Sequence, residues 1–168
     1  DNNQYNTIKI GNQIWMAENL NYETERGSAV YKHDPLLSST YGRLYVWEAA
    51  KNACPIGWHI PKYSEWEKLI SFLGGENVAG GKMKETGSPH WESPNTGATN
   101  ESGFSAVPGG YLGGSGGSYF EGRSAYYWSS SPSKRNGILI CRLFHNSAKA
   151  DSHGAAKECG FSVRCVKN

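Results

Sequence analysis

The most constraining feature of this chain is its last third, in which strand-like blocks frame a polar and irregular segment. Residues 126–128, 138–145 and 161–166 are rich in aromatic and aliphatic side chains, a composition typical of strands. A shorter ribbon is expected at residues 149–153. This part of the chain therefore predicts a β-sheet close to the C-terminus.

The N-terminal segment also predicts strands. Apolar and polar residues alternate over residues 7–16, on either side of Gly11 and Asn12. Such a pair between two alternating runs is typical of a β-hairpin. The apolar side chains expected on one face are Ile8, Ile10, Ile14 and Met16.

Two helices are expected in the next part of the chain. The first spans residues 41–53, where Leu44, Trp47 and Ala50 recur at helical spacing. Pro55 ends it, because proline cannot continue a helix.

The second expected helix has the clearest periodicity. Its apolar residues are Trp66, Leu69, Ile70 and Leu73. Ser64 and Glu67 fit a capping box at its start, and Gly74 and Gly75 fit its end.

Residues 76–123 predict long loops with short strands, held in place by aromatic side chains such as Trp91 and Phe104. The chain has 21 glycines in 168 residues, which is typical of a loop-rich protein. Its length suits one domain over residues 1–168, and no internal repeat divides it.

Charge and hydropathy exclude two classes of partner. The formal net charge is +2 and the basic residues are scattered along the sequence, whereas nucleic-acid binding needs a basic stripe. The sequence contains no run of about 18 apolar residues, which is the length needed to span a membrane. The polar residues 1–4 are typical of a mature or trimmed chain.

The cysteines favour an oxidising compartment. Cys54, Cys141, Cys159 and Cys165 include no C-x-x-C pair, and an even number at long spacing favours disulfides over a zinc site. Three pairings are compatible with the sequence. A zinc site of Cys141 and Cys159 with His145 and His153 is disfavoured, because its spacing matches no compact zinc motif.

A series of motifs follows in order along nearly the whole chain, at residues 10–20, 41–50, 53–61, 65–69, 102–110, 127–130 and 160–166. Together they resemble the Fibrobacter succinogenes major paralogous domain, which is common in secreted and lipid-anchored surface proteins of Bacteroidetes and Fibrobacteres. The resemblance implies an α+β, C-type-lectin-like fold. That fold has two helices, paired N- and C-terminal strands, and a long, loop-rich upper half.

The resemblance also implies a disulfide between Cys54 and Cys165, which ties the first helix to the last strand. A loop of roughly 110 residues closed in this way contributes up to about 4–5 kcal/mol in the chain-entropy model. Cys141 and Cys159 then form a second disulfide between neighbouring strands or remain unpaired.

Residues 135–158 are expected to present the ligand-binding surface. Strand alternation places Arg142 and Phe144 on one face, opposite to Leu143. Ile138 and Ile140 share the face of Arg142, which counts against an outward orientation unless that face is itself apolar. The candidate ligand-binding residues are Arg142, Phe144, Asn146, Asp151, His153, Arg135 and Tyr111.

Other aromatic and polar residues have two interpretations. Tyr119, Phe120 and Tyr126 either extend the binding surface or plug loops against the core. His59, between Trp58 and Ile60, is expected to be a core histidine rather than a catalytic base.

The predicted function is a non-catalytic, extracytoplasmic recognition or adhesion module that binds a cell-surface protein or glycan. Its location is secreted or on the outer-membrane surface, with a lipid anchor in the full-length protein. One hypothesis is that residues 135–158 are diversified for protein ligands, as in some related C-type-lectin-like proteins.

The alternative function is a calcium-independent carbohydrate-binding module. The chain lacks the Glu-Pro-Asn or Gln-Pro-Asp and Trp-Asn-Asp tripeptides of calcium-dependent lectins, so neither a metal nor another cofactor is expected. An enzyme is disfavoured. The residues around Ser130 lack a nucleophile elbow, and no carboxylate or cysteine pair marks a catalytic site.

Overall fold

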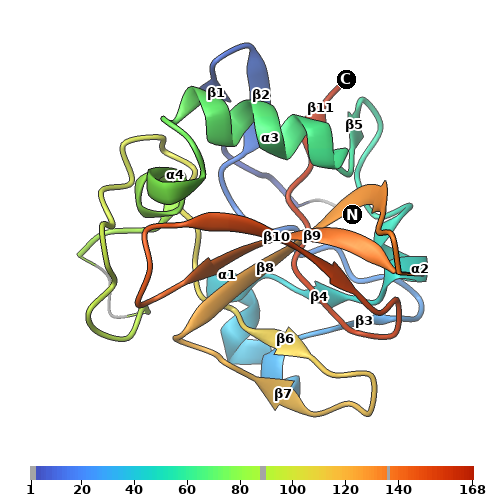
Figure 1. Ribbon diagram of the computed structural model, residues 1–168. Helices are drawn as coiled ribbons and strands as arrows, with labels where there is room; N and C mark the ends of the chain where they lie inside the picture. Colours follow the sequence, from blue (N-terminus) through green and yellow to red (C-terminus); the bar gives the residue numbers. More distant parts are fainter. Residues whose placement is uncertain (1–2, 88–89, 136) are drawn as a thin grey trace.

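A computed structural model describes residues 3–87, 90–135 and 137–168 of the chain. Over these residues the fold is mixed α/β, with several small sheets and few helices (Figure 1). The two larger sheets contain the N-terminal hairpin and the C-terminal strands. The two-stranded sheets are β3 (Ser28–Ala29) with β4 (Leu44–Tyr45), and β6 (Tyr111–Leu112) with β7 (Ser118–Tyr119).

The four-stranded sheet joins the two ends of the chain. Its strands, in the order β1-β2-β11-β5, are Thr7–Ile10, Gln13–Met16, Val166–Lys167 and Trp58–His59. Val166 of β11 pairs with Trp15 of β2 on one side and with His59 of β5 on the other. The expected hairpin and the expected pairing of N- and C-terminal strands are both confirmed.

The expected apolar face of the hairpin is wrong. Ile8 lies opposite Trp15, and Ile10 lies opposite Gln13. Opposite residues of an antiparallel pair share a face. The two-residue turn therefore places Ile8 and Ile10 with Trp15, whereas Ile14 and Met16 point to the other side.

The three-stranded sheet has the order β10-β9-β8 and comprises Ala150–Ala155, Ile138–Phe144 and Ser124–Pro132. Each was expected as a strand, although β8 and β10 are longer than the sequence indicated. Residues 161–166 were also expected to form a strand. In that segment Phe161 and Ser162 form isolated bridges instead, with Tyr45 and Tyr127, and only Val166 belongs to a strand, β11.

Each face of this sheet packs against a core cluster. Cys141 and Leu143 of β9 belong to a core cluster that includes Trp66 and Met83 of the two longer helices. The alternate residues Ile138 and Ile140 belong to a second cluster, which includes Trp128 and Phe161.

The helix with the clearest periodicity is confirmed as α3 (Tyr63–Phe72). It lies across one side of the three-stranded sheet (Figure 1). Its cap differs from the expected one. The carboxylate of Glu65, and not that of Glu67, accepts a hydrogen bond from the backbone N–H of Lys62 at 2.8 Å.

A further helix, α4 (Glu76–Met83), was not expected because Gly80 and Gly81 lie in its interior. These glycines permit close packing of backbones. A Cβ atom at Gly80 would lie 2.0 Å from the carbonyl oxygen of Lys149, and one at Gly81 would lie 2.2 Å from that of Gly97.

The expected helix over residues 41–53 is wrong. That region contains the end of α1 (Ser38–Tyr41), strand β4 and α2 (Trp47–Ala50), and two 3-10 turns (Tyr31–His33 and Pro35–Leu37) precede it. Gly42 interrupts the helix with φ 68°. Tyr45 then exchanges backbone hydrogen bonds with Phe161, at 2.9 and 3.1 Å. Pairing with a distant segment therefore overrides the local helical spacing.

The disulfide between Cys54 and Cys165 is confirmed and joins residues 111 positions apart in sequence. Of the two alternatives for Cys141 and Cys159, the structure shows the unpaired one, because both cysteines are free. They cannot pair, since Cys141 is buried in the cluster beneath α3 and α4 while Cys159 packs against the other cluster. None of the helices in the described ranges is long and apolar enough to cross a membrane.

Candidate functional site

The outer part of the β9–β10 hairpin carries a bidentate ion pair. Arg142 and Asp151 lie opposite each other in the two strands. Nε of Arg142 donates to Oδ1 of Asp151 at 2.8 Å, and Nη2 donates to Oδ2 at 3.0 Å. Because two parallel hydrogen bonds fix both side chains, the guanidinium has a defined position at the surface.

A continuous row of aromatic rings begins beside this pair. The guanidinium of Arg142 lies 5.5 Å from the centre of the Phe144 ring. From Phe144 the ring contacts continue through Tyr126 and Tyr111 to Tyr119, with centroid separations of 6.0, 5.2 and 5.2 Å. We call Phe144, Tyr126, Tyr111, Tyr119 and the adjoining Phe120 the aromatic row.

The aromatic row borders a hollow of about 260 Å³, which we call the aromatic depression. Its lining residues are Phe120, Arg123, Ser124, Tyr126, Phe144, His145 and Asn146. Phe120 is 50 % exposed and Tyr119 is 43 % exposed, so apolar ring surface is open to solvent here. The depression thus combines aromatic faces with the polar ends of Arg123, His145 and Asn146.

Tyr126 and Tyr111 of the row are neutral hydrogen-bonding groups. Burial raises the pKa of the Tyr126 hydroxyl, and the nearby Arg142 partly opposes this increase. Burial also raises the pKa of Tyr111. Both hydroxyl groups therefore keep their protons at neutral pH.

A buried lysine supports the turn between β9 and β10. Lys84, which directly follows α4, is fully buried, and its Nζ donates to the carbonyl oxygens of Phe144, Ser147 and Thr96 at 2.9–3.0 Å. Burial lowers its pKa to about 8. Lys84 could not be predicted as a functional residue from the sequence, because nothing in its local pattern distinguishes it from an exposed lysine.

The structure brings together most of the predicted binding residues. Arg142 contacts both Phe144 and Asp151, and Tyr111 is connected to Phe144 through Tyr126. Asn146 lines the aromatic depression. Ile138 and Ile140 share a face of β9 with Arg142, but they are buried. Arg142 and Phe144 lie farther along that face and are partly exposed, so the face is apolar at one end and open to solvent at the other.

Two predicted residues lie elsewhere. Arg135 and His153 line a separate hollow of about 660 Å³, which includes Lys134 and Leu139. That hollow shares no lining residue with the aromatic depression. Phe120, for which the sequence left a surface or a core position open, and Arg123, which was not predicted, line the aromatic depression instead. The chain from β7 to β8 passes beside the β9–β10 turn, where the carbonyl of Arg123 accepts a hydrogen bond from the backbone N–H of His145.

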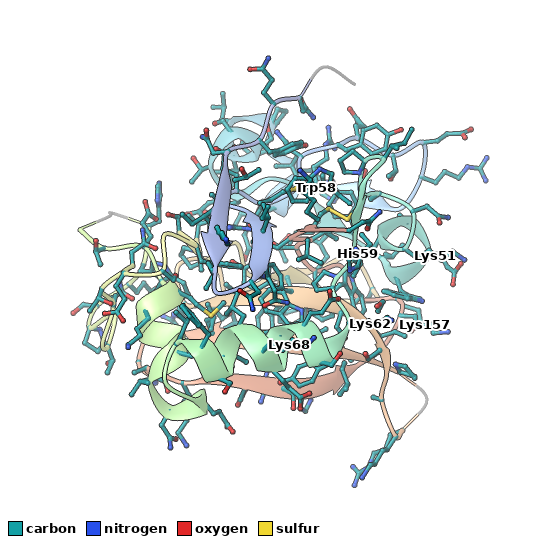
Figure 2. All side chains as sticks on the ribbon, turned by 90° about the horizontal axis from the view of Figure 1, so that it is seen from above. Lys51, Trp58, His59, Lys62, Lys68 and Lys157 are labelled. Atoms are coloured by element: carbon teal, nitrogen blue, oxygen red, sulfur yellow. A yellow bond between two sulfur atoms is a disulfide. The ribbon has the colours of Figure 1, made fainter. Side chains whose placement is uncertain are left out.

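Lysines that are distant in sequence gather on another face. Figure 2 shows Lys51, Lys62 and Lys157 on the same side of the molecule, near His59. The prediction of scattered basic residues thus holds along the sequence but not in space. Part of this charge is compensated by Glu48, which forms an ion pair with Lys51. The positive charges of Lys51 and, to a smaller extent, Lys157 lower the pKa of the Glu48 carboxyl.

His59 is not a core histidine, contrary to expectation. Its imidazole is partly exposed, with Nε2 3.0 Å from a carboxylate oxygen of Glu65 and Nδ1 2.6 Å from Oδ1 of Asn168. Its position in an edge strand, β5, leaves the ring at the surface. Across the described ranges, no three His, Cys, Asp or Glu side chains are grouped so that they could hold a metal ion.

The chain matches the model of a known protein family. Residues 8–167 match the model of the family described as the Fibrobacter succinogenes major domain. No curated protein and no solved structure matches the chain.

Proposed function

We propose that this chain, which belongs to the Fibrobacter succinogenes major domain family, is an extracytoplasmic, non-catalytic recognition module that binds its ligand at the aromatic depression. The observation that carries the proposal is the aromatic row, which is open to solvent at Tyr119 and Phe120 and bordered by the Arg142–Asp151 pair. Exposed aromatic rings beside arginine are typical of binding hot spots.

The fold proposed for this module is C-type-lectin-like. Three observations support it. The N- and C-terminal strands pair at Trp15 and Val166, and a disulfide ties Cys54 to Cys165 beside that pairing. The third is the long, loop-rich segment between α4 and β8, which supplies Tyr111, Tyr119 and Phe120 to the proposed binding surface.

The proposed location is secreted or on the outer-membrane surface, with a lipid anchor in the full-length protein. The intramolecular disulfide supports an extracytoplasmic location, because disulfides persist in oxidising compartments.

The binding surface is preorganised. Lys84 holds the β9–β10 turn through three carbonyl oxygens, and the bidentate pair with Asp151 holds Arg142. Side chains that are already fixed lose less entropy on binding. This arrangement supports a function in recognition, with little rearrangement of the module itself.

The ligand is proposed to be a cell-surface glycan or protein. The depression is small, and its apolar rings lie beside the hydrogen-bonding groups of Arg123 and Asn146, a combination that fits the apolar and hydroxyl-bearing faces of a sugar ring. This favours calcium-independent carbohydrate binding as the first ligand class to test.

Residues 135–158 are proposed to be diversified for protein ligands, and the packing of the core limits the positions at which their side chains could vary. Ile138, Ile140, Cys141, Leu143 and Ala150 are buried in the two core clusters, so their substitution would disturb the fold. Diversification would then be confined to side chains outside the core, such as those of Arg142, Phe144, Asn146, Asp151 and His153.

The test is a glycan array with three proteins: wild type, a Phe120→Ala/Phe144→Ala variant and a Phe72→Ala control. Phe72 is 65 % exposed on α3, so the control removes an exposed aromatic ring outside the depression. A saccharide bound by wild type and control, but at least about tenfold more weakly by the double variant, would support the proposal.

Equal binding by all three proteins would move the site away from the aromatic depression. If no glycan binds, the same proteins are used to capture partners from bacterial and host cell surfaces. A protein partner lost only in the double variant would keep the site and make its ligand a protein. Absence of any partner that distinguishes the double variant would contradict the proposal.

A further inference from the structure

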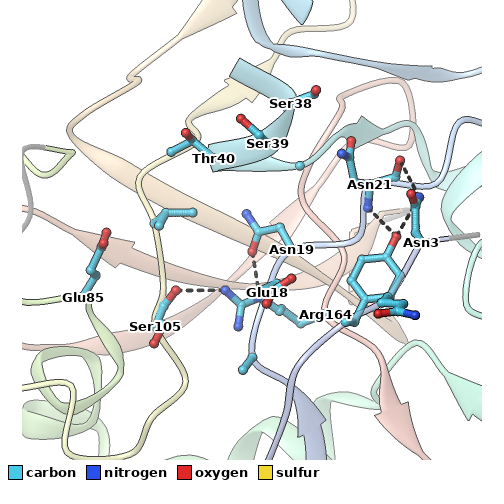
Figure 3. A pocket seen from close by; sticks show the side chains of 15 residues that line it. Asn3, Glu18, Asn19, Asn21, Ser38, Ser39, Thr40, Glu85, Ser105 and Arg164 are labelled. Carbon is cyan, nitrogen blue, oxygen red and sulfur yellow. Dashed lines mark hydrogen bonds between the residues drawn. The ribbon is translucent and has the colours of Figure 1, made fainter. Parts of the chain in front are cut away.

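A polar cavity of about 230 Å³ lies between the segment of Glu18 to Asn21, helix α1 and the loop of Ser105 (Figure 3). None of its lining residues lines the aromatic depression. Its walls carry hydroxyl, amide, carboxylate and guanidinium groups, and it is therefore a separate place at which a small polar molecule could bind.

The guanidinium of Arg164 forms part of the cavity wall. Arg164 is fully buried and, in the described part of the chain, has no carboxylate within ion-pair distance. It donates to Oδ1 of Asn19 at 2.7 Å and to the backbone carbonyls of Met16, Phe104 and Ser105. A guanidinium has five N–H groups, so these four bonds leave one N–H of Nη2 without a partner among the described residues.

Asn21, which lines the cavity, also carries an acceptor without a partner among the described residues. The Oδ1 atom of Asn21 is buried and accepts no hydrogen bond from the described residues. The backbone N–H of the same residue donates to the hydroxyl of Tyr5 at 3.0 Å, which fixes the position of the segment. A buried amide oxygen without a donor costs free energy, and a ligand hydroxyl would supply that donor.

Helix α1 (Ser38–Tyr41) contributes hydroxyl groups to the cavity, and Figure 3 shows Ser38, Ser39 and Thr40 across from Asn19 and Arg164. The hydroxyls of Ser38 and Ser39 donate to carbonyl oxygens in their own turn, at 2.8 and 3.4 Å. Their lone pairs therefore remain able to accept hydrogen bonds from a ligand.

The charges on the lining disfavour an anion. Glu18 and Glu85 line the cavity together with Arg164, so two carboxylates accompany one guanidinium. A phosphate or sulfate would meet more negative than positive charge. A neutral molecule with several hydroxyl groups matches both the donors and the acceptors of the lining.

The volume limits the size of the ligand. At about 30 Å³ for each water molecule, the cavity holds roughly eight waters. Sites for drug-sized ligands begin at about 300 Å³. The cavity therefore suits one six-membered ring with its hydroxyl groups, and the ring of Tyr5 adds an apolar surface.

We propose that this cavity binds a single neutral sugar ring, with Arg164 donating to the ligand, Asn21 accepting from it, and Thr40 bonding to it through its hydroxyl. This is a second ligand site, distinct from the aromatic depression and independent of it.

The test is a titration of ¹⁵N-labelled protein, followed by NMR, with D-glucose, D-galactose, D-mannose and N-acetyl-D-glucosamine, and with sodium sulfate as the anionic probe. We expect at least one sugar to shift the amide signals of Asn21, Thr40, Ser105 and Arg164, while sulfate does not. The methyl glycosides of that sugar identify the source of the ring: binding that survives methylation indicates the end residue of a glycan, and binding that is lost indicates a free sugar.

Two variants make the proposal falsifiable. Thr40→Val removes one cavity hydroxyl at nearly constant volume. Asn21→Leu removes the unpartnered oxygen, and the Asn21 side chain makes no hydrogen bond to the described residues that this change would remove. Each is expected to weaken sugar binding by about tenfold or more, without a decrease in Tm for Asn21→Leu. Thr99→Val, an exposed threonine outside the cavity, is the matched control and should bind like wild type.

The proposal is overturned if no sugar shifts these signals, if sulfate shifts them instead, or if Thr40→Val and Thr99→Val bind equally well. The Phe120→Ala/Phe144→Ala variant should bind the sugar in this cavity with unchanged affinity. Its loss of binding would assign the sugar to the aromatic depression, which separates failure of this proposal from failure of the function proposed above.

Discussion

Lys84 donates a hydrogen bond from its buried ammonium group to the backbone carbonyl of Phe144 at 3.0 Å. The same ammonium bonds to Ser147 and Thr96 and lies 5.3 Å from the centre of the Trp91 ring. No carboxylate shares the site among the described residues, so carbonyl dipoles and an aromatic face compensate the charge. One side chain thus connects the end of α4 to the turn that carries the proposed ligand site.

Replacement of this lysine should weaken both the fold and the site. Lys84→Met removes the donor for three carbonyl groups, and we expect a decrease of about 1–3 kcal/mol in the free energy of unfolding. Denaturation in urea measures this change. Lys68→Met, at an exposed position on α3, is the control and should leave the stability within about 0.5 kcal/mol of wild type. An equal effect of both substitutions would contradict the role of Lys84.

The titration of Lys84 should be visible in the pH dependence of stability. Burial lowers its pKa from 10.5 to about 8 in the folded protein. Between these values the unfolded chain binds more protons, so this group makes the free energy of unfolding rise with pH. The difference in stability between wild type and Lys84→Met should therefore rise by up to about 1.4 kcal/mol per pH unit in that window. A difference that stays constant from pH 7 to pH 10 would refute this assignment.

Buried tyrosines should have the opposite effect at higher pH. Burial raises the pKa of Tyr127 to about 12, and those of Tyr41 and Tyr63 to about 12 as well. Between pH 10 and 12 the folded state binds more protons than the unfolded state, so stability falls as pH rises. The Tyr127 hydroxyl is buried without a hydrogen-bond partner in the described structure, so Tyr127→Phe should leave the stability at pH 7 unchanged or raise it by about 1 kcal/mol.

Thermal unfolding from pH 7 to pH 11 measures the loss of stability that the titration of Tyr127 causes. The variant Tyr127→Phe should lose less stability than wild type above pH 10. Tyr119→Phe, at an exposed position, should follow the wild-type profile. If both variants follow it equally, Tyr127 does not titrate as its burial indicates.

Loss of the Cys54–Cys165 disulfide should lower the stability far more than loss of a free thiol. A Cys54→Ser/Cys165→Ser variant opens a loop that spans 111 positions, and the chain-entropy model predicts a loss of about 4–5 kcal/mol. Cys159→Ser removes a free and partly exposed thiol and is the control, with an expected change below about 0.5 kcal/mol. Denaturation in guanidinium chloride measures both variants, and equal loss in the two would contradict the pairing.

Local patterns predicted those parts of the fold whose stability comes from neighbouring residues. The spacing of Trp66, Leu69 and Leu73 predicted α3, because one helical face packs against the sheet. The alternation around Gly11 predicted the β1–β2 hairpin. In the hairpin, however, the assignment of faces was wrong because it depended on the register of the two-residue turn.

The secondary structure predicted from local sequence was wrong where pairing or packing with a distant segment overrides the local preference for helix. Leu44 and Trp47 have helical spacing, but the hydrogen bonds of Tyr45 with Phe161 make part of that segment a strand. Helix α4 was missed because Gly80 and Gly81 weaken the helical pattern. They are present because the backbones of Lys149 and Gly97 approach too closely for any side chain.

The sequence by itself determined the family, the mixed α/β composition, the main strands and helix α3, and the strand from which Arg142 and Phe144 project. Tertiary structure decided which of these residues meet. Ring contacts through Tyr126 connect Tyr111 to Phe144, and Lys84 reaches the turn beyond β9. Such contacts depend on packing between segments that are far apart in the chain, and the spacing of residues along one segment contains no information about them.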